Sequence, residues 1–166
     1  KRIGRIPEAI AAYKIAIQLN KTNPASYYNL SLIYFNAGKY DKAIKHLELA
    51  LKYNIEYIDA YHTLIHICHI KQQYKKAKDL IEQGYKQTQN IIFYKVRGQN
   101  YSLQNISDKA IEQYELYLAK SHDDYQIHHY LAVEYLKLDK TEEAAEHNLK
   151  ALKINPEHAE SCHNLA

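Results

Sequence analysis

The sequence predicts an all-α protein built from helical hairpins that stack one after another along the chain. Three observations support this fold class. One motif returns at nearly constant spacing, apolar residues within each copy follow the period of an α-helix, and glycine or proline stands where successive helices should end or begin. We therefore expect no β-strands.

The repeat is visible when the chain is compared with itself. Five segments align, 8–17, 42–51, 76–85, 109–118 and 143–152, and their first alanines are Ala9, Ala43, Ala77, Ala110 and Ala144, at spacings of 34, 34, 33 and 34 residues. A second set of segments aligns upstream of these, at 26–35, 60–69, 93–102, 127–136 and 161–166. The alignment predicts full units at 24–57, 58–90, 91–124 and 125–158. Residues 1–23 would be the C-terminal part of one unit and residues 159–166 the start of another.

Each full unit is expected to hold two helices joined by a tight turn. In the unit 24–57 the packing residues of the first helix lie at i, i+3, i+4 and i+7, and they are Tyr27, Leu30, Ser31 and Tyr34. Those of the second helix are Ala43, Leu47, Ala50 and Leu51. Gly38 stands between them where a left-handed residue ends a helix, and Gly4 has the same place in the first, incomplete unit. Pro7 suits the opening turn of a second helix, and Pro24 and Pro156 mark turns that start first helices.

The pattern resembles the tetratricopeptide repeat (TPR) family over the whole chain. Within each unit that family favours an aromatic residue at position 4, Leu at 7, a small residue at 8, Tyr at 11, Ala at 20 and a small residue at 27. Ala at position 20 is present in all five units that reach it. Small residues at positions 8, 20 and 27 would let neighbouring helices approach closely. The resemblance implies one right-handed superhelical solenoid over residues 1–166, whose first helices line an inner, concave groove.

Departures from the family pattern fall in the second and third full units. Ile65 replaces the small residue at position 8, Tyr117 replaces the small residue at position 27, and Asn105-Ile106-Ser107 replaces the usual turn sequence. We expect looser packing there and some change of superhelical geometry.

The inner groove is where the sequence offers a function. The resemblance implies that positions 2, 5, 6, 9, 12 and 13 of the first helices point into it, and helical spacing supports a stripe separate from the packing residues. Leu32, Phe35, Val133 and Leu136 are apolar at positions that should face solvent, which is typical of a binding surface unless helices of a longer protein cover them. The candidate peptide-binding residues are Tyr28, Asn29, Leu32, Phe35, His62, His66, His69, Lys95, Gln99, His129, Tyr130 and Val133.

This groove indicates a non-catalytic scaffold for protein–protein interaction that takes an extended or helical peptide of a partner. Lys95 and the central imidazoles would favour acidic or hydrogen-bonding groups of that peptide. The alternative is the recruiting arm of a larger enzyme, such as a glycosyltransferase, with its catalytic domain outside this sequence. The absence of methionine favours a segment of a longer polypeptide, and open ends of the stack could allow self-association. An RNA-reading helical repeat is disfavoured by the 34-residue period and the weak net charge.

The sequence predicts no metal, cofactor or catalytic site. His62, His66 and His69 share one stripe, but His62 and His69 would lie about 10 Å apart at a rise of about 1.5 Å per residue, so one ion could bind only two of them. We interpret them as hydrogen-bonding groups on a wet groove. HExxH, P-loop, dinucleotide-binding and GxSxG motifs are absent. Cys68 and Cys162 fall at helix-packing positions and are expected to be buried, inert thiols.

Composition narrows the class of protein further. Of the 166 residues, 46% are hydrophobic and 25% charged, which is typical of a folded rather than a disordered chain. A formal net charge of +3 is too small to indicate nucleic-acid binding. No apolar run approaches the roughly 20 residues that membrane insertion of a helix requires. Two cysteines without a CxxC pair favour a reducing, cytoplasmic compartment.

Overall fold

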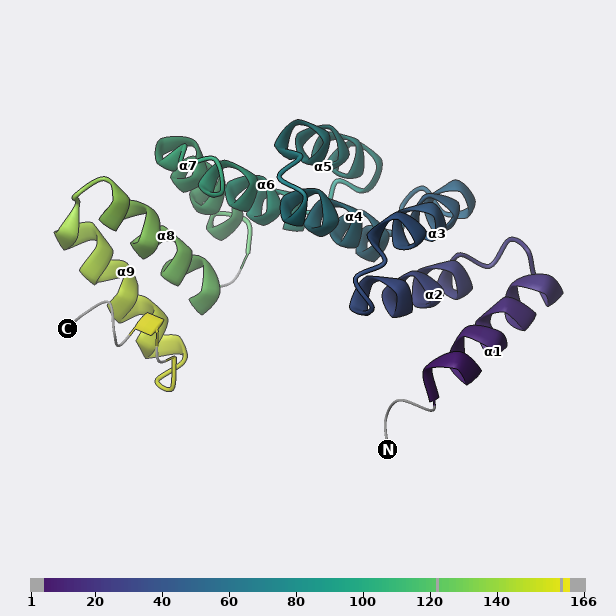
Figure 1. Cartoon of the computed structure of the whole chain (residues 1–166). Helices are drawn as coiled ribbons and strands as arrows, with labels where there is room; N and C mark the ends of the chain where they lie inside the picture. Colours follow the sequence, from purple (N-terminus) through teal and green to yellow (C-terminus); the bar gives the residue numbers. More distant parts are fainter. Residues whose placement is uncertain (1–4, 122, 159, 162–166) are drawn as a thin grey trace. The chain divides into compact units, whose positions relative to one another are not determined.

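The computed structural model describes residues 5–121, 123–158 and 160–161, and all regular elements within them are helices. The helices are α1 (Arg5–Leu19), α2 (Pro24–Asn36), α3 (Tyr40–Tyr53), α4 (Ile58–Ile70), α5 (Tyr74–Thr88), α6 (Ile92–Ser102), α7 (Ser107–Leu118), α8 (Tyr125–Lys137) and α9 (Thr141–Ile154). Figure 1 shows consecutive helices folding back on one another as hairpins. The predicted all-α architecture is confirmed.

The chain divides into two compact units, residues 1–88 and residues 89–166. In the first unit, α2 pairs with α3 and α4 with α5, while contacts of α1 with α2 and of α3 with α4 join successive pairs. In the second unit, α6 pairs with α7 and α8 with α9, and α7 contacts α8. The boundary between the units falls two residues before the end of the second predicted full repeat, 58–90.

Small residues lie at the centre of the hairpins, as the repeat pattern predicts. The buried small residues at positions 8, 20 and 27 of the repeats are Ser31, Ala43, Ala50, Ala77, Gly84, Gly98, Ala110, Ala132, Ala144 and Ala151. Ile65, the large residue at position 8, is 1% exposed, so the core of its hairpin accepts the extra volume. Tyr117, the large residue at position 27, is half-buried, and its hydroxyl lies 3.5 Å from Oδ2 of Asp124. The buried small residues therefore allow the helices of each hairpin to pack closely.

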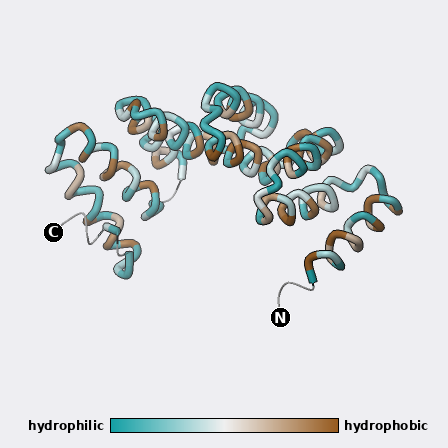
Figure 2. The backbone as a smooth tube through the Cα atoms, viewed as in Figure 1, coloured by the Kyte–Doolittle hydropathy of each residue, from teal (hydrophilic) through white to brown (hydrophobic). Residues whose placement is uncertain are grey.

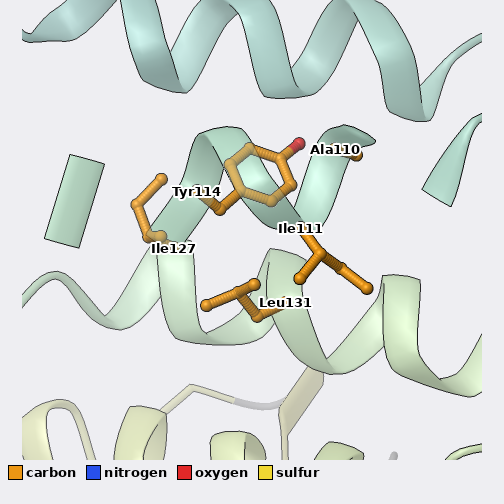
Figure 3. Close-up of a cluster of buried hydrophobic side chains, with 5 residues drawn as sticks. All are labelled: Ala110, Ile111, Tyr114, Ile127 and Leu131. Atoms are coloured by element: carbon orange, nitrogen blue, oxygen red, sulfur yellow. The ribbon is translucent and has the colours of Figure 1, made fainter. Parts of the chain in front are cut away.

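In the second unit a compact apolar cluster joins α7 to α8. Figure 3 shows Ala110, Ile111 and Tyr114 of α7 meeting Ile127 and Leu131 of α8. Four of these five side chains are at most 1% exposed, and Ile111 is 8% exposed. The cluster fixes α8 against the preceding hairpin through apolar burial.

The turns inside the hairpins share one backbone conformation. Gly38 has φ 68°, as predicted, and Gln72, Asn105 and Asp139 at the equivalent place have φ 55°, 56° and 58°. In all four turns the next amide donates to a carbonyl five residues earlier, for example from Lys39 to Tyr34 at 2.9 Å and from Ile106 to Tyr101 at 3.1 Å.

The expected disturbance at Asn105-Ile106-Ser107 is therefore wrong at the level of the turn. Asn tolerates the left-handed region better than most residues, because its short polar side chain can hydrogen-bond locally. Gly4, the other predicted turn glycine, lies outside the described residues.

Candidate functional site

The first helices of the first unit carry seven of the twelve predicted binding residues, and Phe35 connects two hairpins. Its ring centroid is 5.3 Å from that of His66 in α4 and 5.8 Å from that of Tyr40 in α3. Tyr28, two turns earlier in α2, packs its ring 5.1 Å from Tyr57, just before α4. Phe35 and Tyr28 are both half-buried, so part of each aromatic surface stays open to solvent.

Polar side chains border this aromatic surface. On α2, Asn29 and Leu32 are half-buried, and on α4, His62 and His66 are exposed while His69 is half-buried. The three histidines are four and three residues apart, so they follow one face of α4. Across the described ranges, no group of three or more His, Cys, Asp or Glu side chains is arranged to hold a metal ion. The face thus offers imidazole and amide hydrogen-bonding groups beside aromatic rings.

Lys95, in the second unit, already has partners for its charge. Its Nζ lies 3.4 Å from Oδ2 of Asp124 and donates to Oε1 of Gln126 at 2.9 Å, and its side chain is only 15% exposed. Asp124 is the N-cap of α8, where its Oδ1 accepts from the Gln126 amide at 2.9 Å. Lys95 therefore ties α6 to the start of α8, and its ammonium group is not open to an anionic ligand.

His129 also lies inside the second unit rather than on an open surface. The residue is buried, its Nε2 is 3.1 Å from Oε2 of Glu160, and its ring centroid is 4.9 Å from that of His158. Burial, followed by the neighbouring His158, lowers the pKa of His129. The imidazole thus connects α8 to the segment that follows α9.

The remaining predicted residues of the second unit are half-buried: Gln99 on α6, and Tyr130 and Val133 on α8. Tyr130 also packs towards the core, with its ring 5.7 Å from that of Tyr114. The structure thus places the twelve predicted residues in two sets, one in each compact unit. Lys95 and His129 are engaged by internal partners, whereas the aromatic set on α2 and α4 keeps open surface.

A histidine between two rings recurs in both units, and sequence reasoning missed it. In the first unit, His46 of α3 lies between Tyr27 and Tyr34 of α2, with ring centroids 6.4 Å and 5.4 Å away. Burial lowers the pKa of His46. The signal was present in the sequence, because His46 and His147 occupy the same place in their repeats.

In the second unit, the equivalent His147 of α9 lies between His128 and Tyr135 of α8. The ring centroids are 5.2 Å and 5.5 Å from that of His147, and the Nδ1 atoms of His128 and His147 are 3.0 Å apart. Burial lowers the pKa of His128 and lowers that of His147 to about 4. One Nδ1 must donate and the other accept, so at least the accepting imidazole must be neutral, and protonation of both rings would break the contact.

A buried carboxylate in α8 was likewise not foreseen. Glu134 is 1% exposed, and its Oε1 accepts from the Ser102 hydroxyl and from Nζ of Lys137 at 2.7 Å. Burial and the nearby Glu134 charge raise the pKa of Tyr114. These contacts link α6 to α8, one repeat apart, beneath the surface.

The cysteine prediction is confirmed for Cys68, which is 2% exposed. Burial raises the pKa of its thiol, so the reactive thiolate is disfavoured. Cys162 lies outside the described residues. Figure 2 shows hydrophobic and hydrophilic residues mixed along each helix, and no helix of the described residues is both long and apolar enough to cross a membrane.

Models of the tetratricopeptide repeat match three stretches of the chain. A TPR repeat model matches residues 2–38, and two further tetratricopeptide repeat models match residues 24–57 and 125–158. The two latter ranges coincide with full units predicted from the spacing. No curated protein sequence matches the chain significantly.

Solved structures show the same fold at low sequence identity. YrrB, described as a TPR protein with an unusual peptide-binding site, is 21% identical, with a TM-score of 0.72 over 97% of this chain and 84% of that one. MamA (41-end) from Desulfovibrio magneticus RS-1 is 22% identical, with a TM-score of 0.76 over 95% and 89% of the two chains. TTC0263, a thermophilic TPR protein of Thermus thermophilus, is 20% identical, with a TM-score of 0.76 over 98% and 90%.

The repeat models and these structures agree with the helical hairpins, the buried small residues and the turns described above. The repeat models support an interaction scaffold as the general role, since TPR proteins bind peptides or proteins and are generally non-catalytic. The chain belongs to the tetratricopeptide repeat family.

Proposed function

We propose that this protein is a non-catalytic scaffold that binds a peptide of a partner protein along the exposed faces of α2 and α4, the first helices of its first two full repeats. The observation that carries the proposal is the half-buried aromatic surface of α2, where Tyr28, Leu32 and Phe35 stay partly open while Phe35 contacts His66 of α4. A partly open apolar surface bordered by polar groups is typical of a peptide-binding face.

The chemistry of this face favours a peptide with apolar or aromatic anchors and few charges. Among the predicted groove positions of α2 and α4, formal charge is limited to the carboxylate of Asp59, at position 2 of its repeat. His62 and His66 on the same helix are counted as neutral. Lys95 is neutralised by Asp124, so it supplies no free cation for an acidic peptide. The relative YrrB, whose description includes a peptide-binding site, makes a peptide the first ligand to test.

The experiment selects peptides from a random library against the chain and measures their affinity for variants. The double variant Leu32→Ala/Phe35→Ala should weaken binding at least about tenfold, because each lost apolar anchor costs roughly 1–2 kcal/mol. The matched control Leu116→Ala/Leu149→Ala truncates two exposed leucines on second helices and should leave affinity unchanged. Equal affinity of both double variants for the selected peptides would refute the proposed face.

A further inference from the structure

The two compact units carry opposite formal charge. Residues 1–88 contain 14 Lys and Arg against 7 Asp and Glu, a net charge of +7, whereas residues 89–166 contain 8 against 12, a net charge of −4. The overall charge of +3 conceals this difference. The chain therefore has a basic and an acidic part that could attract each other between molecules.

The contrast is sharpest at one equivalent place in the second and fourth full repeats. The first turn of α5 carries Lys75 and Lys76, and the first turn of α9 carries Glu142 and Glu143. Counted from the start of each repeat, both pairs stand at positions 18 and 19. We name Lys75 and Lys76 the basic edge and Glu142 and Glu143 the acidic edge.

Helix stability explains the acidic edge but not the basic edge. The N-terminus of a helix carries partial positive charge, so carboxylates in the first turn stabilise it and lysines destabilise it. Accordingly α1, α3, α7 and α9 each have an acidic residue in the first turn, and α5 has none. The two lysines thus stand at an unfavourable place for their own helix.

Both edges are available to a partner. All four side chains are exposed, and none makes a hydrogen bond or an ion pair within the part of the chain that the structure describes. They contrast with Lys71, which pairs with Asp41 at 2.7 Å, and with Glu146, which pairs with Lys150 at 2.6 Å. Two adjacent like charges without counter-charges of their own favour an oppositely charged partner.

We propose that two copies of this chain associate through these edges, with the basic edge of one copy against the acidic edge of the other. A second copy is the fitting occupant because it presents the complementary charge pair at the same place of the repeat. The contact involves second helices and leaves the faces of α2 and α4 to the peptide, so it is separate from the proposed function.

The test is a charge exchange measured by sedimentation velocity on the full chain. The wild-type chain should self-associate at about 50 mM salt and lose at least about tenfold in affinity at about 300 mM, because salt screens exposed charges. Lys75→Glu/Lys76→Glu gives two acidic edges, and Glu142→Lys/Glu143→Lys gives two basic edges. Each variant alone should be monomeric, and an equimolar mixture should associate as the wild type does.

A matched control separates the edges from net charge. Lys45→Glu/Lys52→Glu makes the same charge change on the exposed surface of α3 and should leave self-association within about threefold of wild type. The proposal is overturned if the wild-type chain is monomeric at low salt, if the mixture of variants stays monomeric, or if the control abolishes association equally. Circular dichroism checks that every variant keeps its helices.

Discussion

The ring of Tyr114 occupies the space that a Cβ atom on Gly98 would need. A Cβ built on Gly98 would lie 2.6 Å from Cδ1 and 2.9 Å from Cζ of Tyr114, which is closer than real Cβ contacts allow. Tyr114 is 1% exposed, and its neighbours in the apolar cluster leave the ring little room to move (Figure 3). The glycine therefore lets α6 and α7 approach with a large aromatic ring between them.

The first prediction concerns this contact. Gly98→Ala should lower the free energy of unfolding of the second unit by about 1–3 kcal/mol, because overpacking forces side chains or backbone to shift. Urea denaturation followed by circular dichroism measures the change. Gly98→Ala combined with Tyr114→Leu should cost less than the sum of the two single changes, since the shortened side chain makes room for the methyl group. Additive costs would show that the two residues do not interact.

The second prediction concerns the left-handed turn position shared by Gly38, Gln72, Asn105 and Asp139. Gln72→Gly should raise the free energy of unfolding by about 0.5–1 kcal/mol, because Gln pays a steric cost at positive φ that Gly does not. Gly38→Gln should lower it by a similar amount. Thermal melting of both variants shows whether each change raises or lowers the stability of the fold. A destabilised Gln72→Gly variant would contradict the account.

The third prediction concerns the contact between His128 and His147. Because burial lowers the pKa of both imidazoles, the unfolded chain binds protons more readily than the folded chain. The free energy of unfolding should therefore be greatest above about pH 6.5 and should fall as the pH drops towards about 4, where His147 titrates in the folded state.

Groups facing the pair modify this dependence. Asp123 and Asp124 favour protonation of His128, Glu146 favours that of His147, and Lys150 opposes both. His128→Tyr copies the arrangement of Tyr27, His46 and Tyr34 in the first unit and should reduce the loss of stability between pH 7 and pH 5. Chemical denaturation at both pH values measures it, and an unchanged loss in the variant would count against the histidine pair as its source.

The fourth prediction concerns the buried carboxylate of Glu134. Glu134→Ala should lower the free energy of unfolding by about 1–3 kcal/mol, because the Ser102 hydroxyl and Lys137 lose their shared acceptor. Glu134→Gln should cost less, since an amide oxygen can still accept from Ser102. Urea denaturation measures the free energy of unfolding of both variants. An alanine variant as stable as the wild type would contradict the assigned role of Glu134.

Much of the fold could be predicted because one spacing governs it. Four of the alanines at 33–34-residue intervals, Ala43, Ala77, Ala110 and Ala144, are buried in the hairpin cores, while Ala9 is half-buried. Gly38 takes the predicted left-handed turn. Sequence reasoning treated glycine as the mark of that turn, so Gln72 and Asp139 went unnoticed. The hydrogen bonds of the turn, rather than the residue type, hold the backbone there.

The candidate site was harder to predict, because partners one repeat away decide which side chains are open. Lys95 finds Asp124 and Gln126 about 30 residues later, and His129 finds Glu160 at a similar separation. A helical stripe says which face a residue lies on, but not which neighbour reaches it. The ring of Phe35 stays partly exposed, and its role as a peptide-binding residue is a prediction for experiment to test.

Photo-crosslinking tests the central claim most directly. A peptide selected against the chain, carrying a photoreactive residue at each position in turn, is irradiated in the complex, and the crosslinked residues are identified by mass spectrometry. Crosslinks confined to the segments 28–35 of α2 and 62–69 of α4 are the predicted result. Crosslinks concentrated on α3 or α5, with none on α2 and α4, would contradict a peptide-binding face on the first helices.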